Sequence, residues 1–186
     1  MQNKQEKENI AKYFENTLTL RQVFILPAPN FFMFDLTLFQ INEKPTGYSQ
    51  NFFSVKSLPK NFFASSSDLL KARTLVKRVK YFHYQIYEPQ QGLIKLMKEH
   101  NCTLVVALSD FFAISYSEMA KRLKRVRVLV KIANNAKVRV RVFSLARNYN
   151  EIRDEYEIYW ISKLLGMKDS QIENFRLEEY EQAIKN

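Results

Sequence analysis

Apolar and polar positions follow two different periods along this chain, and each period predicts one kind of element. The runs "VKYFHYQIY" (79–87) and "CTLVVALS" (102–109) are short and rich in aromatic or β-branched residues, as strands are. The second run is apolar almost throughout, which is typical of a strand buried on both faces. Residues 115–135 instead predict a long helix that begins with a capping box between Ser115 and Glu118. Its apolar face repeats at helical spacing through Met119, Leu123, Val126, Val130 and Ala133.

Further segments of both kinds alternate along the chain. Additional strands are predicted at 17–26, 31–39, around "NFFSV" (51–55) and over "KVRVRVFSL" (137–145). The segment 42–60, which holds two prolines and a glycine, otherwise predicts a loop. In the last of these strands Lys137, Arg139 and Arg141 share one face, and the valines between them take the other.

Additional helices have recognisable ends. One is predicted from Asp68, capped by Ser66 or Ser67, and another lies within "EPQQGLIKLMKEH" (88–100). A last helix runs from Asp154 to Leu165, where Gly166 suits a left-handed helix end. Residues 1–16 predict a short polar helix or an arm. This alternation of strand and helix predicts a parallel α/β sheet or barrel, in one domain over residues 1–186.

The net charge of this chain is concentrated in one window. The formal net charge is +10 and the pI is near 9.6, yet residues 119–150 contain no Asp or Glu. Outside the window the cations and acids are equal in number, nineteen each. A block of one sign predicts a polyanionic partner. The ten cations of the window are Lys121, Arg122, Lys124, Arg125, Arg127, Lys131, Lys137, Arg139, Arg141 and Arg147.

Composition also limits the cellular compartments in which this protein is expected. Cys102 is the single cysteine, so an internal disulfide is impossible and a reducing environment fits. No apolar run has the length of a membrane span, and the beginning "MQNKQEKENIAKYF" does not resemble a signal peptide. We therefore expect a cytoplasmic protein without a membrane partner.

Catalytic signals are weak in the sequence. Only His83 and His100 can serve as histidine ligands, no acids cluster on the predicted strands, and Asp35 and Asp110 are interpreted as isolated carboxylates. Such spacing predicts no metal site and no catalytic group, and no histidine lies beside Cys102 to activate it. His83 lies in an aromatic strand and is interpreted as a hydrogen-bonded core histidine or a contact residue.

The order of segments in the second half resembles a known family. "SSSDLLKARTLVKR" (65–78) precedes a short strand, and "YEPQQGLIKLMKEHNCTLVVALSDFF" (87–112) follows it. From residue 115 a long helix leads to a basic strand, a Ser-Ala-type turn, an Arg and a helix that closes on Gly-Met at 166–167. This order is similar to that of the RNase P protein component 3 family, the archaeal relatives of the eukaryotic thirty-kilodalton RNase P subunit. The resemblance covers residues 62–186.

The chain departs from that family at three places. Where members carry Ser-Ser-Ala after the basic strand, this chain has "FSLA" (143–146), and its "RDEYE" (153–157) lacks the usual proline. The first sixty residues do not follow the family pattern. The resemblance implies an α/β barrel of the triosephosphate-isomerase type, and such barrels usually need more than 186 residues. We expect an irregular, shortened TIM-type (β/α) barrel, with its irregularity near the N-terminus.

The resemblance also implies a function. Members are protein subunits of ribonuclease P, the ribonucleoprotein endonuclease that removes the 5′ leader from precursor tRNA. Catalysis belongs to the RNA subunit and its magnesium, so the chain itself is expected to be non-catalytic and to bind no cofactor. Its expected partners are RNase P RNA, RNase P protein component 2, other RNase P proteins and, indirectly, precursor tRNA. Two alternatives stay open: another RNA-binding scaffold protein in RNA processing, and a degenerate metal-dependent phosphoesterase.

Candidate RNA-binding residues come mostly from the basic window. Arg153 joins them because it occupies the family's arginine position after the basic strand, where a guanidinium can bind phosphate in bidentate fashion. Each candidate also has a simpler interpretation as a cation on a solvated helix or edge strand. The paired phenylalanines, such as Phe62–Phe63 and Phe111–Phe112, are interpreted as core or protein-interface residues. The candidates are Arg122, Arg125, Lys137, Arg139, Arg141, Arg147 and Arg153.

Overall fold

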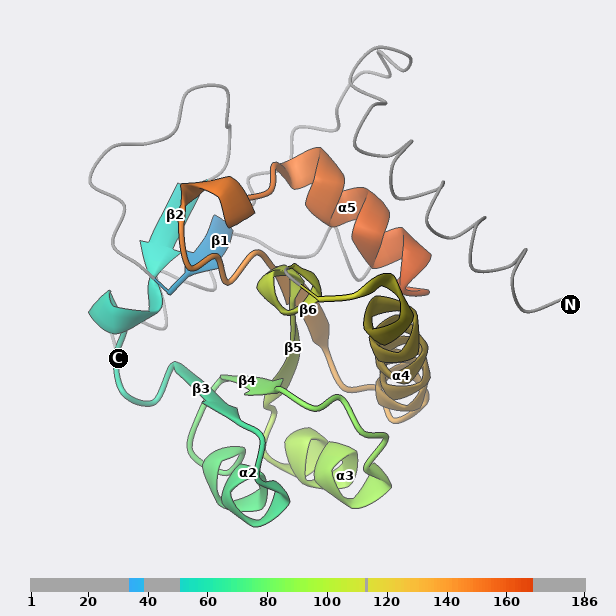
Figure 1. The fold of residues 1–186 in the computed structure, drawn as a ribbon. Coiled ribbons are helices and arrows are strands. Elements are labelled where there is room, and N and C mark those ends of the chain that lie inside the picture. The colour runs from blue at the N-terminus through green and yellow to red at the C-terminus, as the bar shows by residue number, and fades with distance from the viewer. Residues whose placement is uncertain (1–33, 39–50, 113, 169–186) are drawn as a thin grey trace, which may run out of the picture.

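The computed structural model of this chain describes residues 34–38, 51–112 and 114–168. Its centre is a four-stranded parallel sheet with strands in sequence order, flanked by helices (Figure 1). The strands are β3 (Phe63–Ser66), β4 (Tyr81–Tyr84), β5 (Thr103–Ala107) and β6 (Val140–Phe143). The helices are α2 (Leu69–Leu75), α3 (Gln91–Glu99), α4 (Tyr116–Asn135) and α5 (Glu155–Leu164). The short 3₁₀ turns are η2 (Val55–Ser57), η3 (Leu108–Phe111) and η4 (Tyr149–Glu151). The α/β prediction is confirmed.

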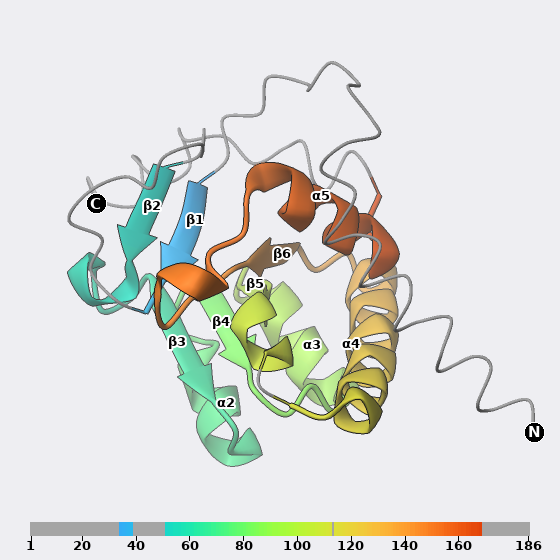
Figure 2. The same ribbon diagram turned by 45° about the horizontal axis from the view of Figure 1, so that its top comes forward.

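A second, two-stranded parallel sheet stands beside the first. Strands β1 (Phe34–Thr37) and β2 (Asn51–Ser54) pair in register from Phe34 with Asn51 to Thr37 with Ser54. One parallel bridge joins Thr37 to Ala146, just after β6, and the Leu38 amide donates to the Ala146 carbonyl at 2.8 Å. The six strands therefore follow a curve that has β2 and β3 at its two ends (Figure 2).

The two faces of the curved sheet bury different cores. Alternate residues of the strands, such as Phe82, Leu104 and Val140, pack against the helices in the larger core. The residues between them, including Tyr81, Val105 and Phe143, meet Leu36 of β1 in a smaller core on the other face. Because β-strand side chains alternate, β4 and β5 contribute residues to both cores, and all nine of their residues are buried.

Helix ends follow the sequence closely. Asp68 caps α2 by accepting a hydrogen bond from the Lys71 amide at 2.8 Å, so the predicted caps Ser66 and Ser67 are wrong by one or two residues. One of the two hydrogen bonds of the capping box predicted for α4 is present: the Ser115 hydroxyl accepts from the Glu118 backbone amide at 3.3 Å. The Glu118 carboxylate instead lies 3.7 Å from the Lys121 ammonium group.

The last helix has the glycine end that its sequence predicted, and it begins with a capping box that was not predicted. Asp154 and Glu157 form a reciprocal capping box at the start of α5. Gly166 follows the helix with φ of +89°, the left-handed conformation expected there.

Some strand predictions were confirmed and others changed. Strands β1 and β2 lie within the predicted segments 31–39 and 51–55. Strand β6 begins only at Val140, so the basic strand is shorter than predicted, and β3 was not predicted as a strand. The predictions for residues 1–16 and 17–26 lie outside the described residues. Within the described part of the chain, no helix is both long and apolar enough to cross a membrane.

Candidate nucleic-acid interface

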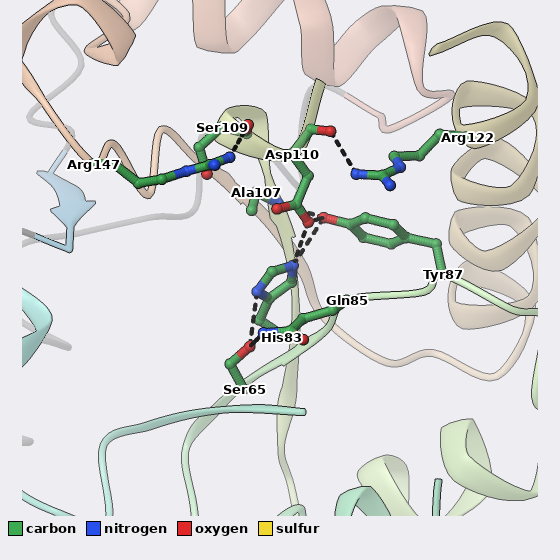
Figure 3. A network of polar contacts seen from close by, with 9 residues as sticks. All are labelled: Ser65, His83, Gln85, Tyr87, Ala107, Ser109, Asp110, Arg122 and Arg147. Atoms are coloured by element: carbon green, nitrogen blue, oxygen red, sulfur yellow. Dashed lines mark hydrogen bonds and ion pairs between the residues drawn. The ribbon is translucent and has the colours of Figure 1, made fainter. Parts of the chain in front are cut away.

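Polar side chains gather where the central strands end. Because the strands are parallel, their carboxyl ends meet at one edge of the sheet, the edge where α/β proteins usually bind ligands. Ser65 lies in β3 and His83 in β4, while Gln85 and Tyr87 follow β4. Asp110 lies in the η3 turn that follows β5 directly (Figure 3).

These side chains form one connected network. The His83 Nε2 atom lies 2.9 Å from Asp110 Oδ2 and 3.0 Å from the Tyr87 hydroxyl oxygen. Tyr87 donates to the same Asp110 oxygen at 3.0 Å and accepts from the Ala107 amide at 2.9 Å. At the other end of the network, Ser65 Oγ lies 3.1 Å from His83 Nδ1 and accepts a hydrogen bond from the Gln85 side-chain amide at 2.9 Å.

Chemistry assigns the direction of each hydrogen bond. The Tyr87 hydroxyl uses its proton on Asp110, and a carboxylate can only accept, so His83 Nε2 carries a proton and donates to Asp110. The other ring nitrogen, Nδ1, faces the Ser65 hydroxyl. His83 is 5% exposed, so the prediction of a hydrogen-bonded core histidine is confirmed.

The ionisation of the network follows from its contacts. Burial by itself raises the pKa of Asp110, but its hydrogen bond and electrostatic attraction to His83, the hydrogen bond from Tyr87 and the Arg122 charge leave that pKa below its ordinary value. Burial raises the pKa of Tyr87 well above its ordinary value, and the Asp110 charge adds to this effect. Asp110 is therefore a carboxylate at neutral pH and Tyr87 is a neutral donor.

Three of the predicted arginines surround the η3 turn. The Arg122 guanidinium, from α4, donates to the Asp110 carbonyl at 2.5 Å, and the Arg147 guanidinium donates to the Ser109 carbonyl (Figure 3). The Arg153 guanidinium carbon lies 4.3 Å from the ring centre of Phe112, in cation–π geometry. Arginines from α4 and from the segment after β6 thus meet the same turn at the carboxyl edge.

The other candidates lie elsewhere. Lys137 and Arg139 are exposed at the opposite, amino edge, where the Arg139 carbonyl accepts from the Leu104 amide at the start of β5. Arg125 is exposed on α4. Arg141 is only 8% exposed, because it shares the inner face of β6 with Phe143. Arg141 therefore does not share the exposure of Lys137 and Arg139.

The exposed side of α4 carries most of the remaining basic charge. Its five exposed cations extend over eleven residues, and Glu118 is the single acidic residue of this helix. A cationic side of this kind, next to the arginines of the η3 turn, forms a broad positive surface. The five cations are Lys121, Lys124, Arg125, Arg127 and Lys131.

The sequence did not reveal the network around Asp110. His83 and Asp110 are 27 residues apart in the sequence, but their side chains lie 2.9 Å apart in the structure. The interpretation of Asp110 as an isolated carboxylate is therefore wrong. One signal was available, because both residues lie at or just after the ends of successive buried strands, and such ends meet at one edge.

The remaining chemistry of the described residues is limited. In the part of the chain that the structure describes, no three His, Cys, Asp or Glu residues are grouped to hold a metal ion. Burial raises the pKa of Cys102 to about 12, which makes its thiol a poor nucleophile at neutral pH.

Comparison with known proteins does not place this chain. No protein-family model matches its sequence, and no curated protein matches it significantly. A functional conclusion must therefore come from the residues and their geometry.

Proposed function

We propose that this chain is a protein subunit of an archaeal-type ribonuclease P and binds the catalytic RNA through the carboxyl edge of its sheet. The observation that carries the proposal is the convergence of Arg122 and Arg147 on the η3 turn and of Arg153 on Phe112, the residue that follows it. The cationic side of α4 extends this positive surface, and the order of segments over residues 62–186 resembles the RNase P family.

RNA binding of this kind is dominated by phosphate contacts. Guanidinium groups bind phosphate oxygens in bidentate fashion, and each neutralised phosphate releases counterions, so affinity falls as salt rises. In the proposed assembly the RNA subunit holds the magnesium and cleaves precursor tRNA. The chain contributes binding and stabilisation beside RNase P protein component 2 and the other protein subunits, and it is not itself catalytic.

We further propose that the six strands form an irregular, shortened barrel. The strand order supports this, because β1 pairs with β2, β3 to β6 pair in sequence order, and the Thr37–Ala146 bridge joins β6 back to β1. Closure would then need contact only between β2 and β3. Val55 and Leu58, from the connection between these two strands, pack against the inner core at that position.

Reconstituted cleavage of precursor tRNA tests the proposed function. The chain alone should not cut precursor tRNA, and it should raise cleavage when added to an archaeal RNase P RNA together with component 2. RNA binding without any gain in cleavage would favour the RNA-processing scaffold. Metal-dependent hydrolysis by the chain alone would instead favour the phosphoesterase alternative.

A further inference from the structure

The η3 turn is held from beneath by buried side chains. The Asp110 carboxylate accepts hydrogen bonds from His83 and Tyr87, and the Tyr87 hydroxyl is itself fixed by the Ala107 amide. The Ser109 amide adds a bond to the Ser144 carbonyl at 2.9 Å. These contacts fix the turn relative to β4, β5 and the end of β6.

The same turn faces the arginines with its backbone carbonyls. Arg122 donates to the Asp110 carbonyl and Arg147 to the Ser109 carbonyl, two adjacent acceptors approached from two sides (Figure 3). A guanidinium is planar and has five N–H donors, so a bond to one carbonyl orients the plane and leaves donors for a phosphate. The position of the turn therefore sets the position of both guanidinium groups.

We propose that His83 and Tyr87 are positioning residues for RNA binding: they do not touch RNA, but they hold the η3 turn that orients Arg122 and Arg147. This inference rests on the proposed function, because it concerns the same arginines. His83 and Tyr87 are almost completely buried, at 5% and 0% exposure, so an effect of either on RNA must travel through the turn. Pre-orientation of binding groups raises affinity because less conformational entropy is lost on binding.

Charge supports the same arrangement. The charged and titratable groups that meet Asp110 are His83 of β4, Tyr87 after β4 and Arg122 of α4. Arg147 reaches the neighbouring carbonyl and also lies 3.5 Å from the Glu151 carboxylate. The Asp110 carboxylate stabilises the nearby Arg122 cation, and the contacts from His83 and Tyr87 keep that carboxylate ionised.

A matched pair of histidine variants tests the positioning role. In His83→Gln the side-chain amide reaches the place of the Nε2 donor, whereas in His83→Asn the amide reaches only the place of Nδ1. Binding of the full chain to a mixed-sequence single-stranded RNA is measured by fluorescence anisotropy, at a temperature where circular dichroism shows each variant folded. Loss of the hydrogen bond to Asp110 is expected to weaken RNA affinity about three- to tenfold in H83N and in Tyr87→Phe, which also loses the bond from the Ala107 amide, with H83Q close to wild type.

A double-mutant cycle distinguishes positioning from a general loss of structure. If Tyr87 acts through the turn, Y87F and Arg122→Ala together should weaken binding by less than the product of their single effects. Arg125→Ala is the control, because Arg125 is exposed one turn of α4 away from the Arg122 contact, so its effect should multiply with that of Y87F. Multiplicative effects in both cycles would overturn the positioning role.

A measurement on the wild-type chain does not depend on variants that fold poorly. Coupling is reciprocal, so RNA bound at Arg122 and Arg147 should shift the nuclear magnetic resonance signals of the buried His83 ring. RNA that binds without shifting those signals, or equal affinities in H83N, Y87F and wild type, would overturn the inference and leave the proposed function standing. Failure of the wild-type chain to bind any RNA would overturn the proposed function itself.

Discussion

Two carboxyl groups, one buried and one half-buried, behave oppositely at the scale of single residues. Asp110 accepts hydrogen bonds from His83 and Tyr87 and stays ionised. Asp35 is completely buried in β1, and its Oδ1 atom accepts from the amides of Leu36 and Ser144, while its Oδ2 atom has no hydrogen-bond partner among the residues that the structure describes. Burial raises the pKa of Asp35 from 3.8 to about 7, although those hydrogen bonds oppose the shift.

Asp35 should therefore make the stability depend on pH. Between the ordinary value of 3.8 and about 7, the folded chain keeps a proton that the unfolded chain has released. The free energy of unfolding should fall by at most about 1.4 kcal/mol per pH unit as pH rises through this window. Above the window it should level off. Asp35→Asn should flatten this slope, as measured by urea unfolding at several pH values. An equal slope in both proteins would mean that Asp35 is not the group responsible.

Individual residues also show what sequence alone could not decide. The alternation of Lys137, Arg139 and Arg141 was correct as a pattern, but a pattern does not say which face of a curved sheet is enclosed. Arg141 lies on the inner face with Phe143, while Lys137 and Arg139 precede the strand and remain exposed. The contact between His83 and Asp110 likewise depends on how β4 and β5 align, which spacing in the sequence does not encode.

At the scale of elements, strongly periodic segments were predicted best. The helical repeat of α4 and the buried run of β5 were recognised because their patterns extend over many residues. Strand β3 was missed because its sequence, Phe-Ala-Ser-Ser, has neither a β-branched residue nor a clear alternation. Ser65 of this strand contacts His83 and Gln85, so the polar character that concealed the strand belongs to the network.

Two glycines offer opposite tests of element ends. Gly166 has φ of +89°, so Gly166→Ala should lower the free energy of unfolding by about 1 kcal/mol even though the added Cβ meets no atom within 4 Å. Gly92 is the second residue of α3, and a Cβ there would make an ordinary contact of 3.6 Å with Arg73. Gly92→Ala should raise the free energy of unfolding by about 0.5 kcal/mol. Equal effects of both changes in urea unfolding would contradict the assigned end of α5.

At the scale of the whole molecule, the basic window does not form a single patch. The sequence located the charge between residues 119 and 150, and the fold divides it among the carboxyl edge, the exposed side of α4, the amino edge and the inner face. This division arises because α4 connects the carboxyl end of β5 to the amino end of β6, and so leads from one edge of the sheet to the other. Its consequence is that only some of these cations can meet one RNA at the same time.

The salt dependence of RNA affinity in two charge-reversal variants tests the account most directly. One variant carries Arg122→Glu and Arg147→Glu at the carboxyl edge, and its matched control carries Lys137→Glu and Arg139→Glu at the amino edge, with the same change in net charge. The carboxyl-edge variant should bind single-stranded RNA more weakly, with a salt slope shallower by about 0.7 for each phosphate that the variant no longer neutralises. The amino-edge variant should keep the wild-type slope. A slope that falls only in the amino-edge variant would contradict the assignment of the interface to the η3 turn.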